Sequence, residues 1–354
     1  MRSRAVLAFC LIASLVLFTF LRHHIRDLAE VARTYATFYP YITSHPDVLY
    51  RYPSHASKPY SKELELELVP TIIHQISLTQ GQDLSLSRYD ATTTSCKALH
   101  PNWTHNFWTD ANASAFMAEN YPKLLPHYLG YKQSIQRANI LRYTLLDHFG
   151  GVYLDLDVTC LHPLDDLRHL PWLTPGAYPA GVNNAFILSR PRHGFLRHLL
   201  DGVQSRDLSW GMPYIKNMLS TGCMFFSNRW MSYVRSLAKA QHAIPEEARV
   251  YILANQAGHM EPHMLRGAVT TPLFQHAGAS SWHGWDAAVI VMIGKHYCYF
   301  AATMGSGATF ATFLIWKMTR SRAASGRSWC SSPSARESLD KIGDVERSVG
   351  VKEG

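Results

Sequence analysis

Two aspartates separated by one residue follow a short apolar run. The segment Gly150-Gly-Val-Tyr-Leu-Asp-Leu-Asp-Val158 alternates apolar and polar residues as a strand does. Tyr153, Asp155 and Asp157 are therefore expected on one face. Carboxylates this close repel each other unless a cation lies between them, and oxygen ligands suit Mg²⁺ or Mn²⁺. The alternative is a strand end with two solvated acids. The pattern indicates a metal site that binds a diphosphate.

The preceding residues 133–149 predict a helix. Their apolar positions fit a helical stripe, and Gly150 and Gly151 provide the stop. Arg137, Asn139 and Arg142 lie on this helix, where they are expected to aim polar groups toward the strand end. A guanidinium there either binds phosphate or forms an Arg–Asp pair that only ties the helix to the strand.

Several blocks, taken together in order, resemble a known family. They are Pro70–Gln75, Trp108–Asp110, Ser134–Tyr143, Gly150–Val158, Cys160–Leu167, Gly181–Ala185, Ser220–Gly222 and His276–His283. The series resembles the DXD-containing glycosyltransferase family of yeast initiating α-1,6-mannosyltransferases. Its last block, followed by an apolar segment, is most similar to the fungal inositol phosphoceramide mannosyltransferases. The likeness extends over residues 70–286.

This resemblance implies an α/β fold of the GT-A-like class, with the ligand at the carboxyl ends of the strands. It implies a metal cofactor, Mn²⁺ or Mg²⁺, held by Asp155 and Asp157. Asp157 is expected to contact the metal directly, and Asp155 to act through water or to hold the ribose. His276 and His283 are expected to complete the metal or diphosphate site, with a packing role as the alternative for each.

The donor is expected to contact Arg137, Asn139, Arg142 and Asn184. Two positions depart from the family pattern. Asn139 stands where the family usually has an Asp, and Ala185 stands where an Asp commonly follows Asn184. An amide hydrogen-bonds a hydroxyl but carries no charge. These departures predict an altered donor preference, reduced turnover, or a paralogue whose function has drifted.

Apolar segments flank the proposed catalytic region. Residues 5–21 and 297–316 carry no charge and are long enough to cross a membrane. We expect residues 1–21 to be a short cytosolic end with a signal anchor, 22–68 a stem, 69–286 a lumenal GT-A-like domain, 287–318 an interfacial segment with a transmembrane helix, and 319–354 a disordered cytosolic tail. A cleaved signal peptide is the alternative at the amino terminus.

Glycosylation sequons and cysteines agree with a lumenal middle. Sequons begin at Asn102 and Asn112. Cys96, Cys160 and Cys223 lie in the expected lumenal part, so at most one disulfide forms among them. The net charge of +8 comes without the aromatic-interleaved basic stripe of a nucleic-acid-binding sheet. No nucleic-acid partner is therefore expected.

The resemblance implies a metal-dependent, retaining mannosyltransferase of the Golgi membrane, with the endoplasmic reticulum as the alternative location. GDP-mannose is the expected donor and inositol phosphoceramide the expected acceptor, in sphingolipid biosynthesis. A membrane-bound regulatory subunit is an expected partner. Two alternatives stay open. One is a Golgi α-1,6-mannosyltransferase that acts on protein-linked glycans. The other is a non-catalytic paralogue that regulates an active enzyme.

Overall fold

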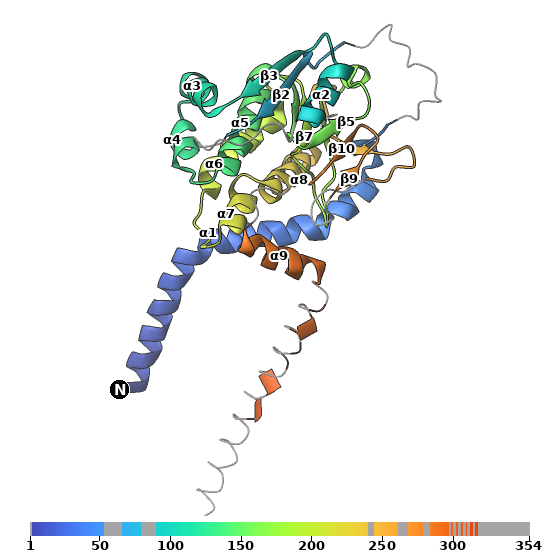
Figure 1. The fold of residues 1–354 in the computed structure, drawn as a ribbon. Helices are drawn as coiled ribbons and strands as arrows, with labels where there is room; N and C mark the ends of the chain where they lie inside the picture. The colour runs from blue at the N-terminus through green and yellow to red at the C-terminus, as the bar shows by residue number, and fades with distance from the viewer. Residues whose placement is uncertain are drawn as a thin grey trace, which may run out of the picture. The chain divides into compact units, whose positions relative to one another are not determined.

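The computed structural model describes residues 2–52, 66–78, 90–239, 244–260, 268–278 and 284–296, with single positions from 299 to 317. The side chains of residues 1–11, 20, 294 and 295 are not described. The chain divides into two units, residues 1–289 and 290–354, and the first carries the fold (Figure 1).

A seven-stranded mixed sheet is the centre of the first unit. Its strands run in the order β1-β8-β6-β7-β4-β2-β3, and β7 is antiparallel to both its neighbours while every other pair is parallel. The strands are β1 (Leu49–Arg51), β2 (Ile72–Ile76), β3 (Thr104–Trp108), β4 (Gly151–Leu154), β6 (Trp172–Pro175), β7 (Phe186–Ser189) and β8 (Tyr251–Ala254). The predicted α/β class, with a mixed sheet, is confirmed.

A second, three-stranded sheet carries the chain that follows β4. It pairs β5 (Val158–Cys160), β10 (Phe274–His276) and β9 (Val269–Thr270) in antiparallel fashion. This pairing brings the block that begins at His276 beside the Asp-x-Asp segment, although the two are more than 100 residues apart in the sequence.

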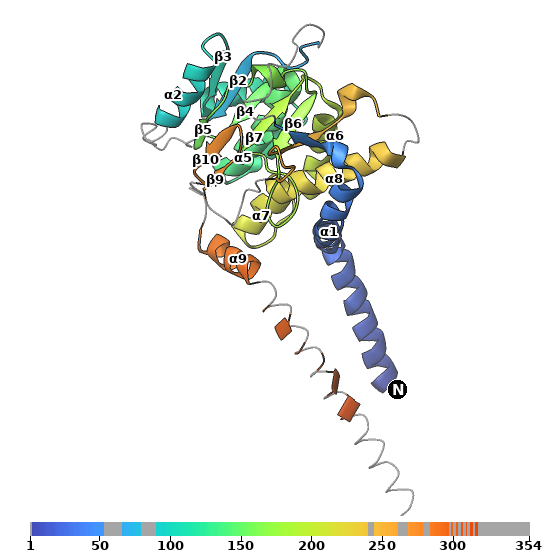
Figure 2. The ribbon, with the colours of Figure 1, turned by 90° about the vertical axis from the view of Figure 1, so that its right-hand side faces the viewer.

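Helices cover both faces of the large sheet (Figure 2). The helices are α1 (Arg2–Ser44), α2 (Asp90–Leu99), α3 (Asp110–Asn120), α4 (Leu125–Gly130), α5 (Ser134–Phe149), α6 (Gly194–Arg206), α7 (Pro213–Ser220), α8 (Cys223–Lys239) and α9 (Trp285–Lys295). One buried cluster joins the sheet to α5, α6 and α8, and a second joins its other face to α2 and the small sheet. Burial of these two apolar faces fixes the sheet between its layers.

The alternation predicted for the Asp-x-Asp strand holds only as far as Leu154. Val152 and Leu154 lie in the second cluster and Tyr153 in the first. β4 then ends, and Asp155–Asp157 form a turn, closed by a hydrogen bond from the Val158 amide to the Asp155 carbonyl at 3.1 Å. The prediction of one alternating strand through Val158 is wrong, because the chain leaves the large sheet here to join the small one.

The two glycines before β4 are required by the backbone. α5 ends as predicted, at Gly150, whose φ is +66°, and Gly151 follows with a φ of +95°. A Cβ at Gly151 would lie 2.5 Å from the carbonyl oxygen of Ile72. Only glycine allows this close approach of β4 to β2.

Part of the segment expected as a stem packs on the domain. α1 runs without interruption from Arg2 to Ser44, and Phe38 and Ile42 are buried in the first cluster. Asp27, only 1% exposed, lies 2.9 Å from the Arg206 guanidinium. β1 then adds to the edge of the large sheet beside β8. Residues 53–65 of the predicted stem lie outside the described residues.

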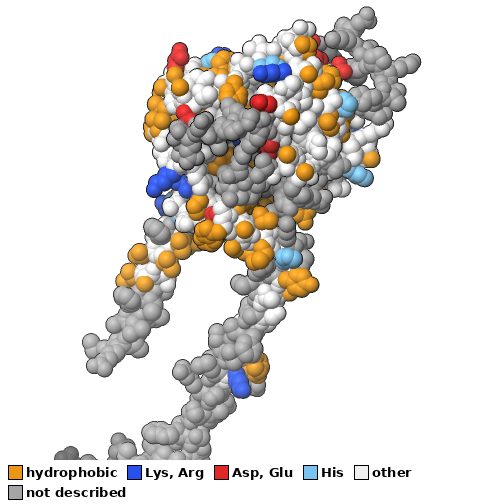
Figure 3. Space-filling model, in the orientation of Figure 1, with side chains coloured by type: hydrophobic (Ala, Val, Ile, Leu, Met, Phe, Trp, Pro, Cys, Tyr) orange, Lys and Arg blue, Asp and Glu red, His pale blue; other side chains and the backbone are white. Residues whose placement is uncertain are grey.

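Within the described part of the chain, no helix combines the length and the apolar character that crossing a membrane requires. Much of the predicted span 5–21, and most positions of the predicted span 297–316, lie outside the described side chains. The predicted tail 319–354 also lies outside the described residues. Figure 3 shows apolar side chains along α1 where it projects from the domain; the large ones, all more than half exposed, are Ile12, Leu15, Val16, Leu17 and Phe18.

His74 predicts a pH dependence of stability. It is fully buried on β2, where its Nε2 lies 3.0 Å from the Gly150 carbonyl and its Nδ1 accepts from the Trp108 indole. Burial lowers the pKa of His74 to about 4. The unfolded chain therefore binds a proton near pH 6.5 that the folded chain takes up only near pH 4. Unfolding free energy falls as the pH drops through this window.

We expect the free energy of unfolding to drop by roughly 2 kcal/mol from this group between pH 7.5 and pH 5. Chemical denaturation of the detergent-solubilised chain at both pH values measures it. The variant His74→Gln, which cannot titrate, should show a smaller drop, whereas His23→Gln, at an exposed position, should behave like the unaltered chain. An equal drop in His74→Gln would contradict the assignment.

Candidate metal and donor site

Asp155, Asp157 and His276 converge at the turn after β4. One ligand atom from each lies within 4.8 Å of the others. His276 is the last residue of β10, and its register opposite Val158 of β5 brings its Nε2 to 3.2 Å from Asp157 Oδ1. The Ala277 amide also donates to the Asp157 carbonyl at 3.0 Å. The small sheet therefore delivers the histidine to the carboxylates.

Arg142 and Tyr153 hold the other carboxylate. Arg142, 2% exposed on α5, lies with its guanidinium 3.2 Å from Asp155 Oδ1, and the Tyr153 hydroxyl donates to the same oxygen at 2.6 Å. The guanidinium carbon stands 4.4 Å from the centre of the Tyr153 ring. This cation–π contact orients the arginine toward the turn.

The local charges set the protonation of the site. Burial raises the pKa of Asp155, and the Arg142 charge works against that rise. Burial by itself disfavours protonated His276, but the hydrogen bond and charge of Asp157 outweigh it, so the pKa of His276 is raised. Arg142 thus lies beside Asp155 and His276 beside Asp157, and the turn remains polar and partly open, with 28% of the Asp155 side chain and 15% of the Asp157 side chain exposed.

The donor set fits a divalent cation. Two carboxylates and an imidazole offer oxygen and nitrogen ligands at one point. Mn²⁺ binds both kinds of ligand, and Mg²⁺ binds the carboxylate oxygens. Asp155, Asp157 and His276 would hold the ion. Their assigned roles stay predictions, and His283 lies outside the described residues.

Asn139 belongs to a buried amide network beside this site. Its Nδ2 donates to Asn217 Oδ1 at 3.0 Å, and its Oδ1 accepts from Asn184 Nδ2 at 3.2 Å. Asn184 also donates to the Tyr143 hydroxyl at 2.7 Å, and its main-chain carbonyl accepts from Arg142 at 2.5 Å. Asn139 and Asn184 are thus hydrogen-bonded to each other, and the Asn184 carbonyl connects them to Arg142.

The second departure from the family pattern leaves a main-chain contact intact. Ala185, 3% exposed, accepts a hydrogen bond from the Asp155 amide through its carbonyl at 2.9 Å. Its own amide donates to Asn183 Oδ1 at 2.7 Å. The segment after β6 therefore supports the turn through its backbone, whichever side chain stands at position 185.

Arg137 lies apart from the carboxylates. Its guanidinium is 3.6 Å from Asp110, the first residue of α3. This ion pair links α5 to α3, and the expected donor contact of Arg137 stays a prediction. Arg142, one turn and a half further along α5, is the arginine that reaches the Asp-x-Asp turn.

A cavity of about 180 Å³ adjoins the turn on its Leu156 side. Gln75 of β2, Asp90 and Lys97 of α2, and His105 of β3 are among its lining residues. Gln75 is 4% exposed, and its Nε2 has no hydrogen-bond partner within the described parts of the chain. A buried amide donor without a partner is costly, so this group favours a ligand that accepts a hydrogen bond.

Sequence reasoning missed several of these residues. Tyr153 was expected on the side of Asp155, but its hydrogen bond to that carboxylate was not predicted. Asn217 and Tyr143 join the network through tertiary contacts that no local spacing indicates. Gln75 was noted only as part of the first strand.

Comparison with known proteins places the turn in a described protein family. The family described as "Glycosyltransferase sugar-binding region containing DXD motif" matches residues 87–171, which include the turn. Inositol phosphoceramide mannosyltransferase 1 of Schizosaccharomyces pombe is 31% identical over 236 residues, covering 66% of this chain and 68% of that protein. The chain belongs to this DXD glycosyltransferase family.

Two further members of the family are similar to this glycosyltransferase at the same level of identity. Inositol phosphoceramide mannosyltransferase 2 of S. pombe is 32% identical over 232 residues, covering 66% of this chain and 63% of that protein. Mannosyl phosphorylinositol ceramide synthase SUR1 of Saccharomyces cerevisiae is 34% identical over 250 residues, covering 71% and 60%. The matched region of the glycosyltransferase therefore spans somewhat less than two thirds of these two relatives.

We predict that Asp157→Asn weakens Mn²⁺ binding by roughly a hundredfold or more, because an amide supplies neither the charge nor the oxygen pair of the carboxylate. Electron paramagnetic resonance of free Mn²⁺, titrated with the full chain, measures the affinity. Asp166→Asn, an exposed acid nine residues away, is the matched control and should bind like the unaltered chain. Unchanged affinity in Asp157→Asn would rule out the site.

Proposed function

We propose that the chain transfers mannose from GDP-mannose to inositol phosphoceramide, with Mn²⁺ or Mg²⁺ and with retention of anomeric configuration. The names of the relatives support the sugar and the acceptor. The observation that carries the proposal is the meeting of Asp155, Asp157 and His276 beside buried Arg142. This arrangement suits a reaction whose leaving group is a nucleoside diphosphate.

The residues have distinct tasks in this proposal. A bound divalent cation would neutralise charge on the departing diphosphate. Asp155, Asp157 and His276 would hold this cation, while Arg142 and Tyr153 fix the Asp155 carboxylate. The amide network orients Arg142 through the Asn184 carbonyl. We name no nucleophile.

The cavity beside Leu156 supports a place for part of the donor. At about 180 Å³ it is smaller than a site for a whole drug-sized ligand, so it suits one ring system or a ribose. Gln75 Nε2 would donate to that group, and Asp90 would accept from it. The diphosphate would then extend from the cavity to the carboxylates across Leu156.

We also propose that the domain is lumenal, in the Golgi or the endoplasmic reticulum, between two membrane anchors. The disulfide between Cys96 and Cys160 supports an oxidising compartment. The exposed apolar residues of α1 support the amino-terminal anchor. An anchored domain would keep its site near a lipid headgroup. A membrane-bound regulatory subunit belongs to the same proposal and rests on the family resemblance.

A transfer assay tests the reaction. Membranes that contain the chain and lack endogenous activity receive labelled GDP-mannose and inositol phosphoceramide, with Mn²⁺ or with a chelator. We expect mannosylated lipid with Mn²⁺ only, none from Asp157→Ala, and undiminished product from Asp166→Ala. Product on a glycan acceptor alone would favour the glycan-directed transferase. Donor binding without product on either acceptor would favour the regulatory paralogue.

Gln75 tests the donor cavity. Gln75→Leu keeps the size of the side chain and removes the buried donor, so the KM for GDP-mannose should rise about tenfold while kcat changes little. Gln204→Leu, at an exposed position of α6, is the matched control. Steady-state kinetics with varied donor measures both. If KM for the donor stays at the unaltered value in Gln75→Leu, the cavity does not receive the donor.

A further inference from the structure

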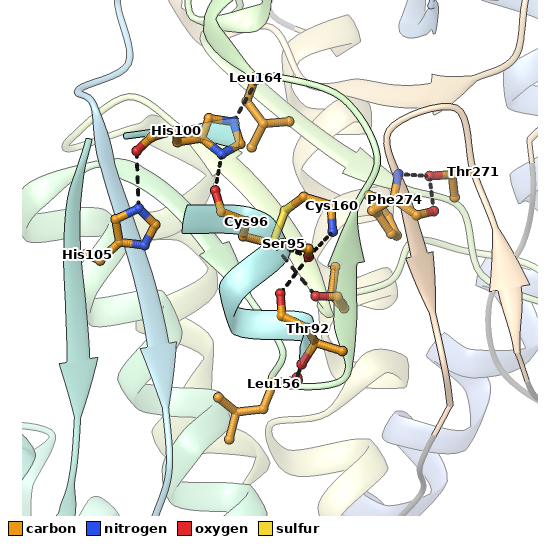
Figure 4. The surroundings of a disulfide bond; sticks show 11 residues. Thr92, Ser95, Cys96, His100, His105, Leu156, Cys160, Leu164, Thr271 and Phe274 are labelled. Carbon is orange, nitrogen blue, oxygen red and sulfur yellow. Dashed lines mark hydrogen bonds between the residues drawn. A yellow bond between two sulfur atoms is a disulfide. The ribbon is translucent and has the colours of Figure 1, made fainter. Parts of the chain in front are cut away.

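Helix α2 and His100, the residue that follows it, contact the chain that carries the two aspartates at three points. The Thr92 hydroxyl donates to the Leu156 carbonyl at 2.5 Å, and Cys96 forms a disulfide with Cys160. His100 Nε2 accepts from the Leu164 amide at 2.9 Å. Figure 4 shows these side chains facing the segment that runs from the turn into β5.

The spacing of these contacts matches on the two sides. Thr92 and Cys96 are four residues apart, which places them on one face of α2, and His100 follows four residues later, just beyond the end of the helix. Their partners at positions 156, 160 and 164 follow the same interval: Leu156 lies in the turn, Cys160 ends β5, and Leu164 lies beyond it. The contacts with α2 therefore extend from the turn to the chain that follows β5.

Ser95 adds a second link at the middle point. Its hydroxyl accepts from the Cys160 amide at 3.1 Å and donates to the Thr92 carbonyl at 2.6 Å. His100 is fixed in turn, because its Nδ1 lies 2.7 Å from the Cys96 carbonyl. The contacts therefore form one connected set rather than three separate bonds.

The Thr92 bond acts directly on a proposed metal ligand. The Leu156 carbonyl belongs to the planar peptide that joins Leu156 to Asp157. A hydrogen bond to this carbonyl therefore fixes the orientation of the peptide plane that contains the Asp157 amide. On the other side, the Ala277 amide holds the Asp157 carbonyl at 3.0 Å. The main chain of Asp157 is held at both its peptides, from α2 and from the end of β10.

We propose that α2 is a brace that sets the geometry of the Asp155–Asp157 turn for its cation, with Thr92 as a positioning residue and the Cys96–Cys160 disulfide as the covalent anchor of the brace. The inference rests on the proposed metal binding at this turn. It goes beyond that proposal by assigning a role to residues that would touch neither cation nor donor. Residues behind the ligands of a metal commonly control its affinity in this way.

Mn²⁺ binding by the full chain tests the brace. Thr92→Val keeps the shape of the side chain and removes the hydroxyl, so affinity should fall roughly tenfold. Thr92→Ser restores the hydroxyl and should bind within about twofold of the unaltered chain. Thr94→Val, an exposed threonine on the same helix, is the matched control. Electron paramagnetic resonance of free Mn²⁺ gives each affinity, and thermal unfolding shows that each variant is folded.

Equal Mn²⁺ affinity in Thr92→Val and Thr94→Val would overturn the brace while leaving the metal site standing. Absence of Mn²⁺ binding by the unaltered chain would overturn both the metal site and the brace. A role in stability alone would lower the unfolding temperature of Thr92→Val and leave its affinity unchanged, which also contradicts the proposal.

The disulfide provides a second measurement. The paired variant Cys96→Ala/Cys160→Ala should weaken Mn²⁺ binding, and adding Thr92→Val should weaken it by less than the product of the separate effects, because both changes release the same element. If the combined variant loses Mn²⁺ affinity by the full product of the two separate losses, the contributions are independent and the single brace is overturned. If the paired variant does not fold, the threonine series alone decides.

Discussion

The repulsion between Asp155 and Asp157 is the constraint on which the rest of the site depends. Their ligand atoms lie within 4.8 Å, where two unit charges at an effective dielectric constant of 20 repel by about 3 kcal/mol. A folded domain tolerates this only with compensating cations. Arg142, on a helix of the first buried cluster, lies beside Asp155, and His276, at the end of a strand of the small sheet, lies beside Asp157. A divalent ion bound by both carboxylates would compensate the repulsion further.

The fold brings these opposing charges together by changing sheets at the turn. Gly151 lets β4 approach β2, and the chain then leaves the large sheet to pair with β10. That exchange is what brings His276 to Asp157. It also leaves the two acids in a turn between the sheets, and α2 contacts the chain on either side of Val158, at Leu156 and at Cys160. In the chain-entropy view, the Cys96–Cys160 bond, with a sequence separation of 64 residues, stabilises the fold by about 4 kcal/mol.

Local patterns in the sequence predicted the parts of this arrangement that depend on neighbours in the chain. The helix ending at Gly150, the buried faces of Val152 and Leu154, and the nearness of two acids all follow from short periods and glycine conformation. The turn at Asp155 was mistaken for continuing strand, because an alternating pattern does not reveal where a partner strand is exchanged. The pairing of Thr92 with Leu156 and the packing of Phe38 on the core depend on tertiary contacts between distant segments. No spacing within one segment encodes those.

Asn139 shows how a departure from a family pattern is accommodated. The position is 3% exposed and three residues before Arg142, so the two side chains are neighbours on α5. A carboxylate there would place a second anion near the guanidinium that compensates Asp155, and it would face the Asn217 oxygen that now accepts from Asn139. The Asn139 amide instead donates to Asn217 and accepts from Asn184. It adds no second anion, so the Arg142 guanidinium pairs with Asp155. The side-chain amides of Asn139 and Asn184 thus have hydrogen-bond partners although both residues are buried. The change at position 139 therefore keeps this position uncharged and leaves the pairing of Arg142 with Asp155 in place.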